Sequence, residues 1–170
     1  MNTVEQTFTD LVTSNQGIIH KICNAYCEAV QDREDLFQEI VLQLWRSYPS
    51  FDLRKNTKFT TWMYKIALNT AITSFRKSTK RGKHIQITDD VLQIPNIHSA
   101  NDDEEQLKLL YQAIQHLSEV ERAVILLYLE DHSYREMAEI TGISESNVGV
   151  RINRIKKKLT EVFEKWNQLT

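Results

Sequence analysis

The stretch from residue 133 to residue 159 contains two helical patterns separated by one glycine. Ser133 and Glu136 have the spacing of a capping box, which marks the start of the first helix. Gly142 follows the last apolar residue of that helix, and Ser144 can cap the next one. In the second pattern four apolar residues recur at helical spacing and predict a buried stripe: Val148, Ile152, Ile155 and Leu159. The stretch therefore predicts a helix-turn-helix.

The face of the second helix opposite this stripe is polar and basic. A helix with this turn chemistry and charge suits the major groove of duplex DNA. The alternative is a solvated basic face on an ordinary core helix. Successive residues of a helix are rotated by about 100° around its axis. Counted in this way, the face and its flanks carry the residues that we predict to contact DNA: Ser146, Asn147, Val150, Arg151, Asn153, Arg154 and Lys157.

Charge is distributed unevenly along the chain, although the net charge is only −2. Residues 1–52 hold 8 acidic and 3 basic side chains, whereas residues 53–88 hold 9 basic and no acidic ones. Residues 89–107 hold 6 acidic and no basic ones, and residues 108–170 balance 9 against 9. A stretch of 36 residues without a carboxylate is a candidate phosphate-contacting surface. We therefore predict a second DNA contact outside the helix-turn-helix.

The same basic stretch is rich in aromatic residues. Such a mixture is typical of surfaces that follow phosphates and stack unpaired bases, so the predicted ligand is single-stranded DNA. For Phe59 and Phe75 the alternative is a place in the core. The interleaved residues are Arg54, Lys55, Lys58, Lys65, Arg76, Lys77, Lys80 and Arg81 with Phe51, Phe59, Trp62, Tyr64 and Phe75.

The length and composition indicate the fold class. A chain of 170 residues suits two small domains of roughly 80 residues each. Four glycines and two prolines are too few for a sheet with many tight turns. We therefore predict an all-α fold with two small helical domains joined by a flexible linker. The domains are expected at residues 1–78 and 104–170, with the linker at 79–103, and the second is a four-helix domain that contains the helix-turn-helix.

Helical patterns fill both predicted domains. Residues 4–30 read as a helix in which Gly17 is a possible break. Asp32 is the predicted N-cap of the next helix, which Pro49 ends. The apolar face of that helix is wider than one small neighbour should bury, which indicates a partner surface or a deep core: Leu36, Phe37, Ile40, Val41, Leu44, Trp45 and Tyr48.

The second domain begins after an acidic run. Residues 102–105 are read as the end of a solvated tether. Helices are then expected at 106–117 and 119–130, where Ser118 and Glu121 form a second capping box. These two helices are expected to wrap the helix-turn-helix.

Several classes of protein are excluded by what the sequence lacks. No apolar run reaches a membrane-spanning length, and residues 1–8 lack the features of a secretory signal, so we predict a cytoplasmic protein without membrane insertion. Cys23, Cys27 and His20 share a helix, but a zinc site needs four ligands, and two small residues in a core is the favoured interpretation. No nucleophile stands with a base, and no glycine loop fits a phosphate. We therefore predict no catalysis, no metal and no cofactor.

The sequence resembles the extracytoplasmic-function group of bacterial RNA polymerase sigma factors, over nearly its whole length. A first motif stands at residues 32–39, Asp-Arg-Glu-Asp-Leu-Phe-Gln-Glu, and is followed by Trp45. The resemblance implies that this helix docks on the coiled coil of the largest polymerase subunit. The docking residues that it implies are Asp32, Glu34, Asp35, Leu36, Gln38, Glu39 and Leu42.

A second motif stands at residues 59–69 and is similar to the promoter-melting region of that family. The resemblance implies that the loop at 51–58 cradles a base flipped from the non-template strand. Leu68 and Thr73 depart from the family pattern, where arginine and aspartate are usual. The residues expected to engage the downstream (minus-10) element are Phe51, Arg54, Lys55, Lys58, Phe59, Trp62, Lys65, Asn69, Arg76 and Lys77.

The helix-turn-helix resembles the domain of these factors that reads the upstream (minus-35) element. Asn153 and Arg154 match positions that face DNA, whereas Gly149 and Val150 replace basic or hydroxyl residues. The resemblance also implies that the helix at 123–129 helps to seat the flap of the second-largest subunit, and that an anti-sigma factor is a partner. The expected function is promoter-specific transcription initiation with core polymerase. A stand-alone helix-turn-helix regulator that binds duplex DNA without polymerase is the alternative.

Overall fold

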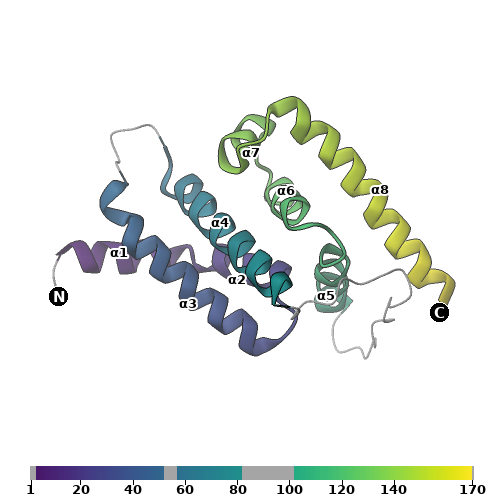
Figure 1. The fold of residues 1–170 in the computed structure, drawn as a ribbon, viewed down its shortest axis with the longest axis horizontal. Helices are drawn as coiled ribbons and strands as arrows, with labels where there is room; N and C mark the ends of the chain where they lie inside the picture. The colour runs from purple at the N-terminus through teal and green to yellow at the C-terminus, as the bar shows by residue number, and fades with distance from the viewer. Residues whose placement is uncertain (1–2, 52–56, 82–101, 170) are drawn as a thin grey trace.

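The computed structural model describes residues 3–51, 57–81 and 102–169. Within those ranges every regular element is a helix, as the composition predicted. The helices are α1 (Thr3–Ser14), α2 (Gln16–Tyr26), α3 (Val30–Ser47), a short 3₁₀ turn η1 (Tyr48–Ser50), α4 (Phe59–Lys80), α5 (Asp102–Ile114), α6 (Glu119–Leu129), α7 (Tyr134–Thr141) and α8 (Glu145–Leu169). Figure 1 shows two groups of helices, α1–α4 and α5–α8. Most of the predicted linker lies outside the described residues.

The N-terminal domain is built on α2, α3 and α4, which pack against one another. Their inward faces supply fully buried aliphatic residues such as Ile22, Ile40 and Met63. The helix predicted at 4–30 is in fact two helices, because the chain breaks at Asn15 and ends its second helix at Tyr26. Gly17 lies just inside α2 and not at the break.

The start of α3 corrects one prediction. The helix begins at Val30 with Ala29 as its N-cap, so Asp32 is not the cap but a residue of the first turn. Its carboxylate is still favourably placed there, because the helix dipole favours negative charge near the N-terminus. At the other end α3 stops at Ser47, and Pro49 lies in the 3₁₀ turn that follows.

The C-terminal domain confirms the local predictions. Both capping boxes form, with the backbone N–H of Glu121 donating to Ser118 Oγ at 3.3 Å and that of Glu136 donating to Ser133 Oγ at 3.1 Å. Gly142 ends α7 in the left-handed region, with φ of 76°. The backbone N–H of Asn147 donates to Oγ of Ser144, the predicted cap at the start of α8. The predicted stripe of α8 is buried against α6 and α7.

The acidic run before this domain is helical. Asp102–Glu105 form the first turn of α5 instead of the end of a tether, and α5 therefore starts four residues earlier than expected. Four carboxylates at a helix N-terminus interact favourably with the helix dipole. This charge pattern would have been a helix start signal in the sequence.

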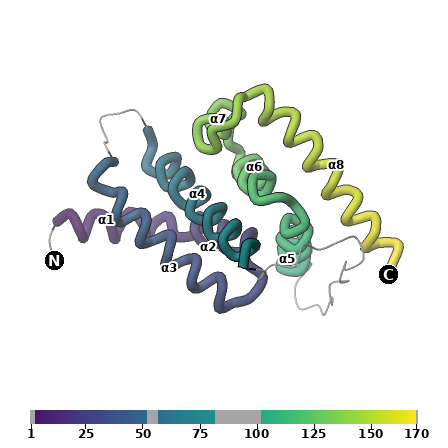
Figure 2. The backbone as a smooth tube through the Cα atoms, in the orientation of Figure 1, coloured from purple at the N-terminus to yellow at the C-terminus, as the bar shows by residue number. Residues whose placement is uncertain are grey.

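The two domains pack directly against each other. Figure 2 shows α6 between the N-terminal helices and α8. The contacts join α2 to α5 and α6, and α4 to α6 and α7. The buried apolar residues of both domains form one continuous cluster, whereas two separate cores would suit two independent domains. The two domains are therefore in direct contact in this structure.

The turn of the helix-turn-helix generates a stability prediction. Gly142→Ala should lower the free energy of unfolding by at least about 1 kcal/mol, because a side chain is strained at φ of 76°. Gly17→Ala is the matched control, since a Cβ there meets no atom within 4 Å and alanine favours a helix. Urea unfolding followed by circular dichroism compares the two. Equal effects of both substitutions would contradict the assigned turn.

Candidate functional site

The polar face of α8 is the first candidate surface. Six of the seven predicted residues are exposed and Arg151 is half-buried, while Val148, Ile152 and Ile155 point into the core. Their positions on one helix agree with the predicted face, and the short α7 lies against its N-terminal part. The residues on this face are Ser146, Asn147, Val150, Arg151, Asn153, Arg154 and Lys157.

Two lysines on the flank of this face already have partners within the domain. Lys158 Nζ lies 2.7 Å from Glu121 Oε1, and Lys156 Nζ lies 4.7 Å from the centre of the Tyr128 ring. Burial acts to raise the pKa of Glu121, but hydrogen bonds from Lys158 and Ser118 outweigh it and hold that pKa below its usual range. These lysines therefore fix α8 to α6.

Gly149 lies beside the first residue of α7. A Cβ at this position would lie 3.4 Å from Cε2 of Tyr134, which is an ordinary van der Waals distance to an exposed side chain. Packing therefore does not require a glycine at residue 149, and the departure from the family pattern has no structural explanation.

The second candidate surface is an aromatic cluster at the N-terminal end of α4. The ring of Trp62 lies 5.0 Å from that of Phe51 and 5.4 Å from that of Phe59, measured between centroids. Tyr48 joins the cluster from η1, at 6.3 Å from Phe51 and from Trp62. The sequence placed Tyr48 only on the apolar face of the preceding helix. All four rings are half-buried, and those of Tyr48, Phe59 and Trp62 pack against the core, so the cluster combines core packing with partial exposure.

A polar stripe continues from this cluster along α4. Trp62, Lys65, Asn69 and Arg76 recur at helical spacing, and the last three are exposed. Lys58 and Lys77 are exposed as well, near the two ends of the helix. The predicted contacts Arg54 and Lys55 lie outside the described residues.

Two aromatic residues of the basic stretch face the other domain instead. Tyr64 is 5% exposed, and its ring lies 5.0 Å from that of His132. Phe75 lies beneath the guanidinium of Arg122, at 4.6 Å. The interpretation of Tyr64 as part of a base-stacking surface was therefore wrong, because α7 packs against this side of α4.

The third candidate surface is the outer face of α3. Leu36 is only 4% exposed and belongs to the core, so the expectation that it contacts a docked partner is corrected. The other side chains of the predicted set are exposed: Asp32, Glu34, Asp35, Gln38, Glu39 and Leu42. Trp45 is 40% exposed on the same helix. The surface thus combines carboxylates with exposed apolar groups.

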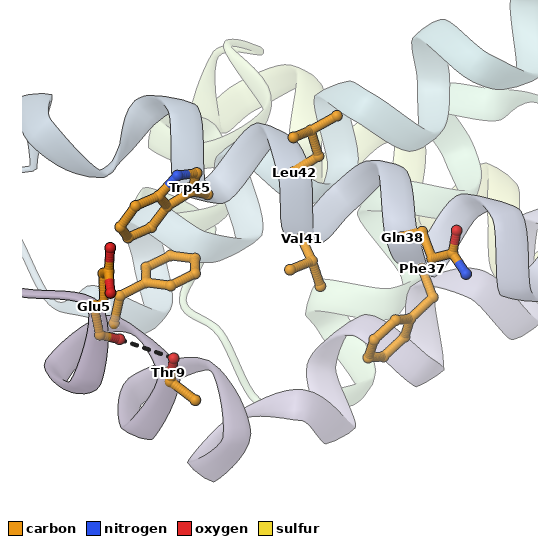
Figure 3. A pocket seen from close by; sticks show the side chains of 8 residues that line it. Glu5, Thr9, Phe37, Gln38, Val41, Leu42 and Trp45 are labelled. Carbon is orange, nitrogen blue, oxygen red and sulfur yellow. Dashed lines mark hydrogen bonds between the residues drawn. The ribbon is translucent and has the colours of Figure 1, made fainter. Parts of the chain in front are cut away.

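An open apolar groove adjoins this face, between α1 and α3. It has a volume of about 680 Å³. Figure 3 shows Val41 between Trp45 and Phe37 along α3, with Glu5 and Thr9 on the facing helix. The ring of Phe8 packs edge-on against that of Trp45 at 4.9 Å. Sequence reasoning found the wide apolar face of α3 but not the groove, because the groove depends on how α1 folds back.

The cysteines lie in an apolar environment. Cys23 is buried and Cys27 packs against the core, as predicted. Burial is the main reason why the pKa of Cys23 rises to about 12 and that of Cys27 to about 11, which keeps both thiols protonated. The ring of His20 lies against that of Phe37. Among the described residues no three metal-binding side chains come together.

Comparison with known proteins identifies the family. The sigma-70 region 2 model matches residues 11–81, and the sigma-70 region 4 model matches residues 107–159. The sigma factor SigW of Bacillus subtilis is 29% identical over 171 residues, which cover 91% of this chain and 88% of SigW. SigX of the same organism is 29% identical, covering 95% of this chain and 86% of SigX.

Solved structures agree on the fold. RpoE of Bartonella quintana, in complex with the anti-sigma factor NepR, matches with a TM-score of 0.70 and 22% identity over 94% of this chain and 98% of RpoE. CnrH, in complex with the cytosolic domain of CnrY, matches with a TM-score of 0.67 and 20% identity over 95% of this chain and 90% of CnrH. The chain belongs to the extracytoplasmic-function group of the sigma-70 family of RNA polymerase sigma factors.

The family defines the general function. As a sigma factor, the chain binds core RNA polymerase, directs it to a promoter class and helps to open the DNA. The full-length similarity to sigma factors disfavours the alternative of a stand-alone regulator. Sigma factors are initiation factors that do not catalyse the reaction themselves. No described helix is long and apolar enough to cross a membrane.

Proposed function

We propose that the three surfaces divide the work of initiation between the two domains. The N-terminal domain, residues 1–78, docks on polymerase through α3 and melts the promoter through α4, and residues 79–103 link it to the second domain. That domain, residues 104–170, anchors the complex on the upstream element through α8. The observation that carries this proposal is the separation of the exposed acidic and apolar face of α3 from the exposed basic faces of α4 and α8.

Docking through α3 is supported by the groups that packing leaves outside. Glu34, Asp35 and Glu39 are exposed, and Leu42 and Trp45 are each 40% exposed beside the groove. Exposed apolar groups surrounded by charge are typical of an interaction surface. The occupant of this surface is core polymerase, through its largest subunit. Residues 123–127 of α6 are buried within the fold. Leu129, at the end of this helix, is 45% exposed and is the part that can contact the flap of the second-largest subunit.

Promoter melting is supported by the aromatic cluster and the stripe beside it. A base flipped out of duplex DNA loses stacking worth a few kcal/mol, and an aromatic surface offsets that loss by about 1–3 kcal/mol for each stacked base. Trp62 provides the surface, while Lys65, Asn69 and Arg76 are placed to follow the strand. Phe51 and Phe59 hold the Trp62 ring, each by a tilted ring contact.

Upstream recognition is supported by the short list of polar groups on α8. Asn153 and Arg154 are exposed and are able to make bidentate contacts to bases in the major groove. Val150 is 46% exposed on the same face and suits the methyl group of thymine. Ser146, Asn147, Arg151 and Lys157 would contact the backbone.

We further propose that the protein acts in the cytoplasm, makes and breaks no covalent bond, and uses no cofactor. In the solved structures, RpoE is in complex with the anti-sigma factor NepR, and CnrH is in complex with the cytosolic domain of CnrY. We propose an anti-sigma partner of the same kind for this chain.

Run-off transcription tests the proposed function directly. The purified chain, added to core polymerase, should produce transcripts from specific start sites that core polymerase alone does not produce. The free chain should bind promoter duplex weakly at physiological salt. Tight, specific duplex binding without polymerase, together with no transcript, would support the stand-alone regulator instead.

Arg154→Ala tests upstream recognition. The substitution should weaken binding of the holoenzyme to a promoter with the upstream element by about 1–3 kcal/mol, because a bidentate base contact is lost. Lys108→Ala is the matched control, since it removes an exposed cation from α5, away from the proposed surface. Filter binding on promoters with and without the element measures the effect. If Arg154→Ala loses affinity equally on both promoters, the residue contacts only phosphates.

Trp62→Ala tests promoter melting. Closed-complex binding should remain, while permanganate reactivity of thymines in the bubble should fall several-fold, because the stacking surface is lost. Trp45→Ala is the control. This variant should be defective in docking, and a saturating concentration of the chain should overcome that defect and give normal bubble reactivity. Normal bubble reactivity in a folded Trp62→Ala variant would exclude the proposed role.

A further inference from the structure

The apolar groove between α1 and α3 has one wall that the family match does not include. Its volume of about 680 Å³ lies within the range of pockets that hold small molecules. Three of the residues that line it come from α1: Glu5, Phe8 and Thr9. All three precede residue 11, where the match to the sigma-70 region 2 model begins. The match to the family therefore leaves the α1 side of the groove unexplained.

The floor of the groove is an apolar stripe along α3. Phe37, Val41 and Trp45 are four residues apart, which places them on one face of the helix. Figure 3 shows the side chain of Val41 between those of Phe37 and Trp45. With a rise of about 1.5 Å per residue, the stripe is about 12 Å long. Leu42 beside it is 40% exposed. The floor therefore suits an extended apolar chain of about this length.

The two ends of the stripe differ in chemistry. At one end the ring of Phe8 packs on that of Trp45, with centroids 4.9 Å apart. Glu5 lies one turn before Phe8 on the same face of α1, so its carboxylate belongs to this end. At the other end the ring of Phe37 lies against that of His20, at 4.8 Å. The groove thus has an acidic end and an aromatic end.

The charge of the lining favours a cation. Of the described residues that line the groove, Glu5 alone is charged, and α1 contains no lysine or arginine. No ion pair joins Glu5 to another described residue. A cation beside this carboxylate would also meet the ring of Trp45, and an indole is the aromatic side chain that attracts cations most strongly. The acidic end therefore suits a positively charged head group.

We propose that the groove binds an amphiphilic organic cation of the alkylammonium class. The charged head lies between Glu5 and Trp45, and the apolar tail lies along Val41 toward Phe37. Binding itself does not depend on the proposed function. A bound cation also covers Leu42 and Trp45, which belong to the proposed docking surface, so it competes with core polymerase. This consequence rests on the proposed function.

Isothermal titration calorimetry of the full-length chain tests the site. The probe is decyltrimethylammonium below its micelle concentration, because its tail is about as long as the stripe. One probe should bind per chain. Decyl sulfate has the same tail and the opposite charge, and it should bind at least about tenfold more weakly because the carboxylate repels it. Added salt should weaken binding of the cation, since exposed charges are screened.

Substitutions on α1 locate the head group and the tail. Glu5→Gln keeps the shape of the side chain and removes its charge, so it should weaken binding of the cation by about threefold to tenfold. Asp10→Asn is the matched control, because it removes an exposed carboxylate of the same helix that does not line the groove. Thr9→Trp changes an exposed residue of the lining and should fill the groove, so that neither probe binds.

Several results would contradict the site. Equal binding of the two probes, an unchanged affinity of Glu5→Gln, or full binding to a folded Thr9→Trp chain would overturn the proposal. Uptake of many probes per chain with loss of helical circular dichroism would show a denaturing surfactant only, and would overturn it as well. A dimer that the probe does not dissociate in sedimentation would mean that a second copy of the chain covers the groove instead.

Run-off transcription tests the competition with polymerase. The probe should lower activity when it is mixed with the chain before core polymerase is added. Glu5→Gln should be several-fold less sensitive and should keep full activity without the probe. Equal inhibition of both chains would overturn the competition. Lower activity of Glu5→Gln without the probe, at unchanged affinity for the probe, would make the groove a polymerase contact instead. If the unaltered chain binds the probe but supports no transcription, the proposed function fails and the site stands.

Discussion

The buried guanidinium of Arg122 sets the geometry of the molecule, because its desolvation must be compensated from both domains at once. Carbonyl oxygens of α2 and of the turn before α6 satisfy its nitrogens, and aromatic rings from α2 and α4 cover its faces. Breaking such a contact leaves a buried charge unpaired, which costs several kcal/mol. Arg122 therefore adds a buried polar contact to the apolar cluster that α2, α4 and α6 share.

Packing around this centre leaves some surfaces available and covers others. The polar face of α8 points away from α6, since its apolar stripe is used for the core. The aromatic cluster of α4 is open at its N-terminal end, whereas Arg76 near the C-terminal end is paired with Glu119. The outer face of α3 lies on the side of the N-terminal domain away from α6 (Figure 1). In this structure the proposed polymerase-docking surface is exposed, whereas Arg76 of the proposed DNA surface is paired with Glu119.

Local features of the fold were predictable because their causes are local. The capping boxes at Ser118 and Ser133, and the left-handed Gly142, depend on residues within four positions of one another, and the structure has all of them. The start of α3 was misplaced because an aspartate is favourable both as a cap and in the first turn. The acidic start of α5 reads as a solvated tether on charge alone, although carboxylates are also favourable in the first turn of a helix.

Long-range features could not be read in the same way. Nothing near Arg122 in the sequence distinguishes it from a surface arginine on an apolar helix, and its partners are up to 97 residues away. The burial of Leu36, the role of Tyr48 in the aromatic cluster and the groove beside Trp45 likewise depend on which helix lies opposite. The residues predicted to face DNA follow from the helical period and the family resemblance, and most of those on α8 are exposed.

In the proposed division of work, α4 opens the promoter and α8 anchors the complex on the upstream element. Transcription from a template whose bubble is already unpaired, compared with the fully paired promoter, tests this division most directly. We expect the unpaired template to restore the activity of a chain altered at Trp62 but not that of a chain altered at Arg154. Restoration of both, or of neither, would contradict the division of labour between the two domains.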